Sequence, residues 1–180
     1  MLVYVVVSNN IDNITGVTFN SVSLTLLDTY KPNAGNWGAN SGVKLFYLLN
    51  PANVSASIVI SSSSGQNIYA SAVSYSGVAQ TGTFGTTSKV RTTTSPVSHS
   101  ITTVNPKSAI FLGVGNNFST APTLTYTSPQ TLRTNDTKPV SYAGEGIYTS
   151  AGTYSVQASW TGGAGNDVAS IAVEMNASTS

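Results

Sequence analysis

The chain has 180 residues, of which 40% are hydrophobic and only 7% are charged, with seven Lys and Arg against six Asp and Glu and a net charge of +1. So few cations, with no basic cluster, argue against nucleic acid as a partner, because phosphate binding draws on many Lys and Arg side chains. The absence of Cys excludes thiol catalysis, disulfides and Cys-ligated zinc.

Short apolar segments separated by Gly, Pro, Asn and Ser recur along the chain, which is typical of β-strands joined by turns. No stretch has a helical period. The predicted strands, by number, are 2–8, 16–20, 22–27, 43–49, 54–60, 67–75, 97–103, 109–115, 123–126, 141–148, 154–160 and 168–175. About a dozen short strands without helices predict an all-β fold of two packed antiparallel sheets, a β-sandwich.

The first strand is a run of six apolar residues directly after Met1: Leu2, Val3, Tyr4, Val5, Val6 and Val7. This run is too short to span a bilayer or to serve as the core of a signal peptide. No basic amphipathic helix is present either, so we expect no membrane partner. Met1 then indicates either a native start made without a secretory signal or the removal of an upstream segment.

The segment 17–24 predicts a tight hairpin, because Asn20 tolerates the positive φ that a two-residue turn requires. Near the end of the chain, two strands each place their larger apolar residues on one face, and we expect those faces to meet in the core. These residues are Tyr154, Val156, Ala158 and Trp160 on one strand and Ala169, Ile171, Val173 and Met175 on the other.

The loops differ in character. Residues 29–42 form a long excursion rich in Gly and Asn, of the kind that carries recognition in β-sandwiches. Residues 81–96 predict a Thr-rich connector that crosses between the two halves of the sandwich. We expect a single domain over residues 1–175, followed by a flexible tail or the start of a linker over 176–180.

Several phrases together resemble a family of jelly-roll modules, similar to concanavalin-like lectin folds, found in bacterial surface proteins and phage structural proteins. They lie, in order, at 2–7, 16–25, 46–51, 72–78 and 169–173. The resemblance implies a jelly-roll, lectin-like sandwich with an adhesive or scaffolding role and supplies no catalytic motif. Such modules have a further strand before the first one seen here. Either an upstream segment has been removed, or a sheet edge is left open for assembly with another chain, at Leu2, Val3, Tyr4, Val5, Val6 and Val7.

An enzymatic function finds little support among the residues present. The sequence has no Gly-x-Ser-x-Gly motif that would supply a nucleophile for its single histidine, His99. We expect His99 to be an exposed strand residue. A glycosidase requires two carboxylates at a defined separation, for which Glu145 and Glu174 are the only candidates on strands. Because Glu174 alternates with Ile171, Val173 and Met175, we expect its side chain to point to solvent. We therefore expect that the protein is not an enzyme and has no cofactor.

A calcium site is the one metal site that the sequence offers. Asn9, Asn10 and Asp12 place several oxygen ligands in one loop, and calcium prefers such ligands. Asn and Asp are equally typical of a turn, where they bond to the local backbone, and EF-hand spacing is absent.

A glycan-binding or partner-binding site is predicted in the long loop, at Tyr30, Asn33, Asn36, Trp37 and Asn40. An aromatic ring flanked by amides contacts both faces of a sugar without using charge. The alternative is that Trp37 anchors its own loop or packs against a neighbouring subunit.

We therefore expect a non-enzymatic structural protein of an assembly surface, acting through shape and strand-edge contacts. A virion component, such as a capsid decoration or fibre protein, comes first, and an extracellular filament subunit second. The partners would be other protein subunits, and the location a virion surface or an extracellular or cell surface. The alternative is a carbohydrate-binding or adhesion module of a larger secreted protein. A surface with almost no charge suits dense packing without repulsion.

Overall fold

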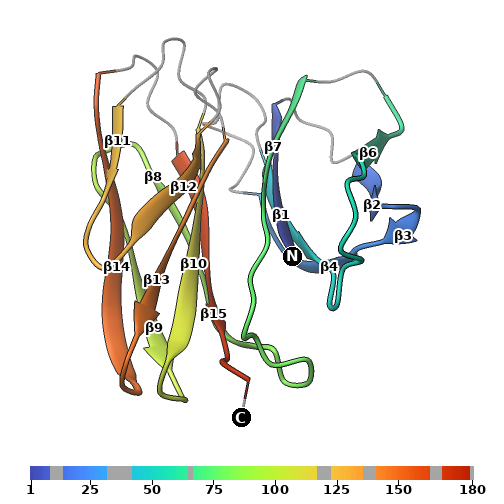
Figure 1. Ribbon diagram of the computed structural model, residues 1–180. Helices are drawn as coiled ribbons and strands as arrows, with labels where there is room; N and C mark the ends of the chain where they lie inside the picture. The colour runs from blue at the N-terminus through green and yellow to red at the C-terminus, as the bar shows by residue number, and fades with distance from the viewer. Residues whose placement is uncertain are drawn as a thin grey trace.

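The structure is a computed structural model that describes residues 1–8, 14–31, 42–64, 67–116, 123–135, 141–162 and 168–178. Every regular element in these ranges is a β-strand (Figure 1). The strands are β1 Leu2–Ser8, β2 Ile14–Phe19, β3 Val22–Ser23, β4 Thr25–Tyr30, β5 Gly42–Tyr47, β6 Ile58–Ser62, β7 Asn67–Val73, β8 Phe84–Thr92, β9 Val97–Thr103, β10 Ser108–Asn116, β11 Thr123–Tyr126, β12 Thr131–Asn135, β13 Ser141–Tyr148, β14 Gly152–Thr161 and β15 Val168–Met175. The predicted all-β class is confirmed.

The strands form four antiparallel sheets, which Figure 1 shows side by side as successive layers. We number them from left to right in that view. Sheet 1 has the strand order β11-β14-β9, sheet 2 β12-β13-β10-β15-β8, sheet 3 β4-β5-β1-β7, and sheet 4 β3-β2-β6. Antiparallel sheets packed face to face agree with a β-sandwich, but the expected number of two sheets is wrong.

Three apolar layers hold the four sheets together. Val97, Ile101 and Trp160 of sheet 1 pack against residues of sheet 2 such as Leu112. A second layer lies between sheets 2 and 3, and a third between sheets 3 and 4. Sheets 2 and 3 are therefore covered on both faces, and burial of this apolar surface is the main force that stabilises the stack.

Strand β15 corrects the predicted core contact, because all eight of its residues are buried. The face containing Ala169 and Ile171 packs against sheet 3, and the opposite face, with Val168 and Ala172, faces sheet 1, where β15 contacts mainly β9. A strand in a middle layer is apolar on both faces, so its larger residues do not reveal which neighbour they contact.

Strand β1 is not an open edge, and the prediction for Leu2, Val3, Tyr4, Val5, Val6 and Val7 is wrong. It pairs with β5 on one side and with β7 on the other, and all six residues are buried. Alternate side chains enter the layers on either side of sheet 3. A continuous apolar run is typical of a strand buried on both faces, as this one is.

Two strands were missed by the sequence prediction. Strand β8 lies within the expected connector 81–96 and pairs with β15, and β12 pairs with β13. Both are edge strands with mixed polar sequences. Their neighbours supply the hydrogen bonds, so no apolar alternation is needed to form them.

The predicted hairpin at Asn20 is confirmed. Asn20 and Ser21 have φ values of 49° and 64°, and the flanking residues Phe19 and Val22 pair directly. Two consecutive positive φ values define the type I′ turn, whose twist matches that of the strands it joins.

Candidate functional site

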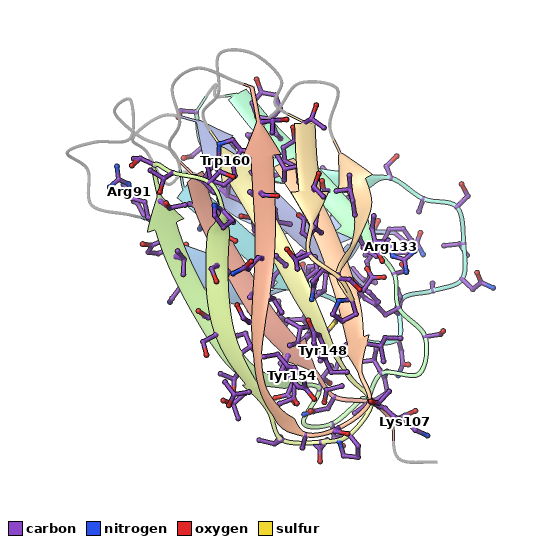
Figure 2. The ribbon with its side chains drawn as sticks, turned by 90° about the vertical axis from the view of Figure 1, so that its left-hand side faces the viewer. Arg91, Lys107, Arg133, Tyr148, Tyr154 and Trp160 are labelled. Atoms are coloured by element: carbon purple, nitrogen blue, oxygen red, sulfur yellow. The ribbon has the colours of Figure 1, made fainter. Side chains whose placement is uncertain are left out.

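The outer face of sheet 1 is built almost entirely from hydroxyl groups. Every second residue of β9, β14 and β11 points away from the core, because side chains alternate along a strand. These residues, which we call the hydroxyl face, are exposed or half-exposed and include no ionisable group: Ser98, Ser100, Thr102, Thr153, Ser155, Gln157, Ser159, Thr161, Thr123 and Thr125. Figure 2 shows this side of the molecule facing the viewer.

Hydrogen bonds across the strands order the hydroxyl face. The hydroxyl oxygens of Thr102 and Thr153, which lie directly opposite each other, are 2.9 Å apart. Those of Ser98 and Ser155 are 3.3 Å apart, and Gln157 Nε2 donates to Ser98 Oγ over 3.1 Å. Such cross-strand pairs restrict short side chains that already have little rotamer freedom. The hydroxyl face thus presents ordered hydrogen-bond donors and acceptors that carry no charge.

A groove of about 440 Å³, with a mixed polar and apolar lining, lies where edges of sheets 2 and 3 meet. One wall is the segment 73–78 that continues from β7, and the other comes from Arg133 of β12 with Glu145 and Ile147 of β13. Lys107 also lines the groove. We call this feature the groove, and its volume falls within the range of small-molecule sites.

Glu145 organises the chemistry of the groove. Its buried carboxylate forms an ion pair with Arg133 and accepts a hydrogen bond of 3.3 Å from the hydroxyl of Tyr75. Burial, reinforced by the negative charge of Glu145, raises the pKa of Tyr75 far above its usual value, so the phenol stays protonated and donates. The Arg133 side chain is 53% exposed, and Arg133 lines the groove.

His99 is not the exposed strand residue that the sequence predicts. It is 1% exposed, and its Nε2 lies 2.8 Å from Ser170 Oγ while Nδ1 lies 3.1 Å from Ser88 Oγ. Burial lowers the pKa of His99 to about 4, so the ring is neutral at pH 7. Residues 97–103 alternate between buried and exposed positions, and His99 occupies one of the buried positions although its side chain is polar.

The His99–Ser170 contact has the length of a base–nucleophile pair, but its proton arrangement is different. The Ser170 hydroxyl donates to the carbonyl oxygen of Gly113 over 2.7 Å, so its oxygen accepts from Nε2–H of His99. An imidazole that donates to a hydroxyl does not activate it as a nucleophile. Both residues are also enclosed between sheets 1 and 2, which makes the contact a buried hydrogen-bond network.

Glu174 is likewise buried, at 0% exposure, and does not point to solvent. Its carboxylate accepts hydrogen bonds from the backbone N–H of Val104 at 2.9 Å and from Ser108 Oγ at 2.8 Å. These bonds fix the turn that joins β9 to β10. The prediction from alternation is wrong here because both faces of sheet 2 are covered, so neither face of β15 meets solvent.

Glu145 and Glu174 do not form a catalytic pair. Glu145 lies beside Phe111 and Glu174 beside Ile110, and these consecutive residues of β10 point to opposite faces of sheet 2. A glycosidase requires both carboxyl groups on one substrate-binding site. The two carboxylates are thus separated by the sheet itself.

Most of the predicted binding loop lies outside the described residues, including Asn33, Asn36, Trp37 and Asn40. The same holds for the calcium candidates Asn9, Asn10 and Asp12, so both sites stay predictions. Tyr30 is half-buried at the end of β4 and packs against the layer between sheets 2 and 3. Its ring thus contributes to the core.

Among the residues that the structure describes, no group of three or more His, Cys, Asp or Glu residues could hold a metal ion. The described part of the chain also has no helix long and apolar enough to cross a membrane.

No family model, curated protein or solved structure matches the chain. The resemblance to jelly-roll modules of surface and phage proteins therefore stays a prediction.

Proposed function

We propose that this chain is a non-enzymatic structural protein of an assembly surface, and that copies of it pack through the hydroxyl face. The uncharged character of that face carries the proposal: its ten outward side chains are Ser, Thr or Gln. The setting that we favour is a virion surface, as a capsid decoration or fibre component, and next an extracellular filament.

The physical argument concerns the cost of covering a surface. Burying a charge requires the loss of its hydration, which is costly unless a well-placed partner compensates. The hydroxyl face holds no charge, and hydroxyl pairs such as Thr102–Thr153 keep their mutual hydrogen bond when water is removed. Each contact is weak, but contacts repeated over an array add up through their high effective concentration.

We also infer that β8 to β15 form a jelly-roll module. The order β8-β15-β10-β13 within sheet 2 and the order β9-β14-β11 within sheet 1 support this, because eight strands shared between two facing sheets are typical of jelly rolls. Strand β12 departs from the pattern by pairing with β13 in sheet 2. Viral capsid and lectin domains share this fold class, so it agrees with the proposal but does not identify the function.

The alternative function is a carbohydrate-binding or adhesion module of a larger secreted protein. The hydroxyl and amide groups of the same face favour it, since they can exchange hydrogen bonds with a neutral sugar. The two functions differ in their ligand: another copy of the chain in the first case and a glycan in the second.

Sedimentation velocity over a wide concentration range tests the proposal. The variant carrying Ser100→Lys and Ser155→Lys places two cations directly opposite each other on the hydroxyl face. The matched control carries Thr15→Lys and Ser61→Lys at exposed positions of the neighbouring strands β2 and β6 of sheet 4.

We expect the wild-type chain and the control to associate as concentration rises, and the hydroxyl-face variant to stay monomeric, because like charges at an interface repel. Association that survives both substitutions on the hydroxyl face would contradict the proposal. A monomeric wild-type chain that binds neutral oligosaccharides saturably, and loses that binding in the same variant, would establish the alternative.

A further inference from the structure

We propose that the groove is a binding site for an acidic sugar, such as a uronic acid residue of a polysaccharide. The groove is separate from the hydroxyl face, since it lies at the meeting edges of sheets 2 and 3. This inference therefore does not depend on the proposed assembly function. It rests on the charges, the local backbone and the lining of the groove.

Charged residues are rare in this chain, yet three of them line the groove: Lys107, Arg133 and Glu145. Glu145 is already paired with Arg133 and bonded by Tyr75. Lys107 is exposed, and no carboxylate of the described residues forms an ion pair with it. Figure 2 shows Arg133 and Lys107 along the same side of the molecule. The lining thus has an excess of positive charge, which suits a single carboxylate.

The backbone directs Arg133 to this position. The pairing of β12 with β13 shifts register between Leu132 and Thr134, so Arg133 is the extra residue of a β-bulge. Bulges re-aim a side chain and are common beside functional sites. The ion pair with Glu145 then holds the guanidinium through Nε, and a planar guanidinium is suited to bind a ligand carboxylate with its remaining N–H groups.

The remaining lining fits the uncharged part of a sugar. The exposed residues Ser74 and Ser76 line one wall and bring two hydroxyl groups to it. Ile147 is 65% exposed in the opposite wall, which is a large value for an isoleucine on a strand. A pyranose ring has polar hydroxyl edges and an apolar C–H face, so it would satisfy both walls.

An extended acidic peptide is the other carboxylate ligand to consider. Such a peptide would bind by adding a strand to a sheet edge, which needs a regular row of backbone groups. The bulge at Arg133 interrupts that row on β12, and bulged edges resist strand addition. The observations therefore favour the sugar.

Isothermal titration calorimetry with trigalacturonate tests the site, with the neutral trigalactose and a glutamate-rich peptide as comparison ligands. We expect saturable binding of trigalacturonate and binding at least about tenfold weaker for the other two, because loss of a charge-assisted hydrogen bond costs roughly a factor of ten. Arg133→Gln and Lys107→Gln should each weaken trigalacturonate binding by a similar factor. Lys89→Gln, which removes a cation on β8, should leave it unchanged.

Arg133→Gln leaves the buried Glu145 without its cation, so the fold of this variant must be checked by amide NMR spectra. Lys107→Gln alters no hydrogen bond of the described residues and keeps the test valid if the first variant unfolds. Equal affinity for trigalactose, tighter binding of the peptide, no binding of trigalacturonate, or insensitivity to Lys107→Gln would each overturn the proposal. If the wild-type chain fails to associate but still binds trigalacturonate, only the proposed assembly function is contradicted.

Discussion

The ring of Tyr4 fills the space that a side chain at Gly113 would occupy. A Cβ atom at Gly113 would lie 2.6 Å from the Cδ2 and Cε2 atoms of that ring. Tyr4 belongs to β1 of sheet 3, Gly113 to β10 of sheet 2, and the Tyr4 hydroxyl donates to the carbonyl oxygen of Ala169 over 3.3 Å. One fully buried side chain thus joins three strands across the interface between the two middle sheets.

Replacing Gly113 by Ala should destabilise the fold strongly. The added methyl group overlaps a ring that is fully buried and cannot move aside, and overpacking of a core costs roughly 1–3 kcal/mol. Urea unfolding at pH 7 measures the loss. The control is Gly16→Ala on β2, where no atom lies within 4 Å of the added group and stability should stay the same or rise slightly. Equal effects at both positions would contradict the contact.

The fold should lose stability between about pH 6.5 and pH 4. The pKa of His99 is about 4 in the folded state because of burial, and close to the usual histidine value of about 6.5 when unfolded. As the pH falls through this window the unfolded state takes up the proton first, so up to roughly 3 kcal/mol of stability is lost. His99→Gln should flatten this part of the pH profile.

Proton NMR provides a direct check, because His99 is the only histidine. Its imidazole signal should titrate with a midpoint near 4 in the folded protein. A midpoint near 6.5 would show that the ring is exposed, contrary to the structure.

Glu174→Ala should destabilise the fold by roughly 1–3 kcal/mol, the cost of an unsatisfied buried donor. Glu174 Oε1 accepts both from the backbone N–H of Val104 and from the Ser108 hydroxyl. The Ser108 hydroxyl can turn to the carbonyl oxygen of Asn105, 3.0 Å away, so the loss falls mainly on the Val104 N–H. Glu174→Gln should cost less, since its remaining oxygen can still accept both bonds. Equal losses in the two variants, measured by chemical denaturation, would argue against this role.

Ser21→Gly should stabilise the hairpin between β2 and β3. Ser21 has a φ of 64°, which costs a residue with a side chain roughly 1 kcal/mol and glycine almost nothing. Asn-Gly is also the preferred pair for this turn. Thermal unfolding should show a higher midpoint for Ser21→Gly and a lower one for Ser23→Gly, on the adjoining strand. A lower midpoint for both would contradict the turn assignment.

Much of the strand layout could be predicted from local sequence. Strands 97–103, 123–126, 141–148 and 168–175 have the predicted bounds, and the turn at Asn20 has the predicted geometry. These features depend on residues close together in the chain. Alternation, turn residues and the positive φ of Asn are all local properties.

The candidate surfaces were harder to predict. The outward residues of β9 and β14 alternate regularly, so the hydroxyl face had a visible signal once both strands were known to be neighbours. The groove had none, because Tyr75, Lys107, Arg133 and Glu145 lie far apart in the sequence. Only the packing of two sheet edges brings them together.

The sequence by itself determined the all-β class, most strand positions and the low charge that limits what the surface can bind. Only the tertiary structure decided that the sheets stack in four layers, that β1 is central, and that His99 and Glu174 are buried. The physical reason is that a strand's apolar pattern reports how many of its faces are covered, whereas the identity of the covering sheet depends on contacts between distant parts of the chain.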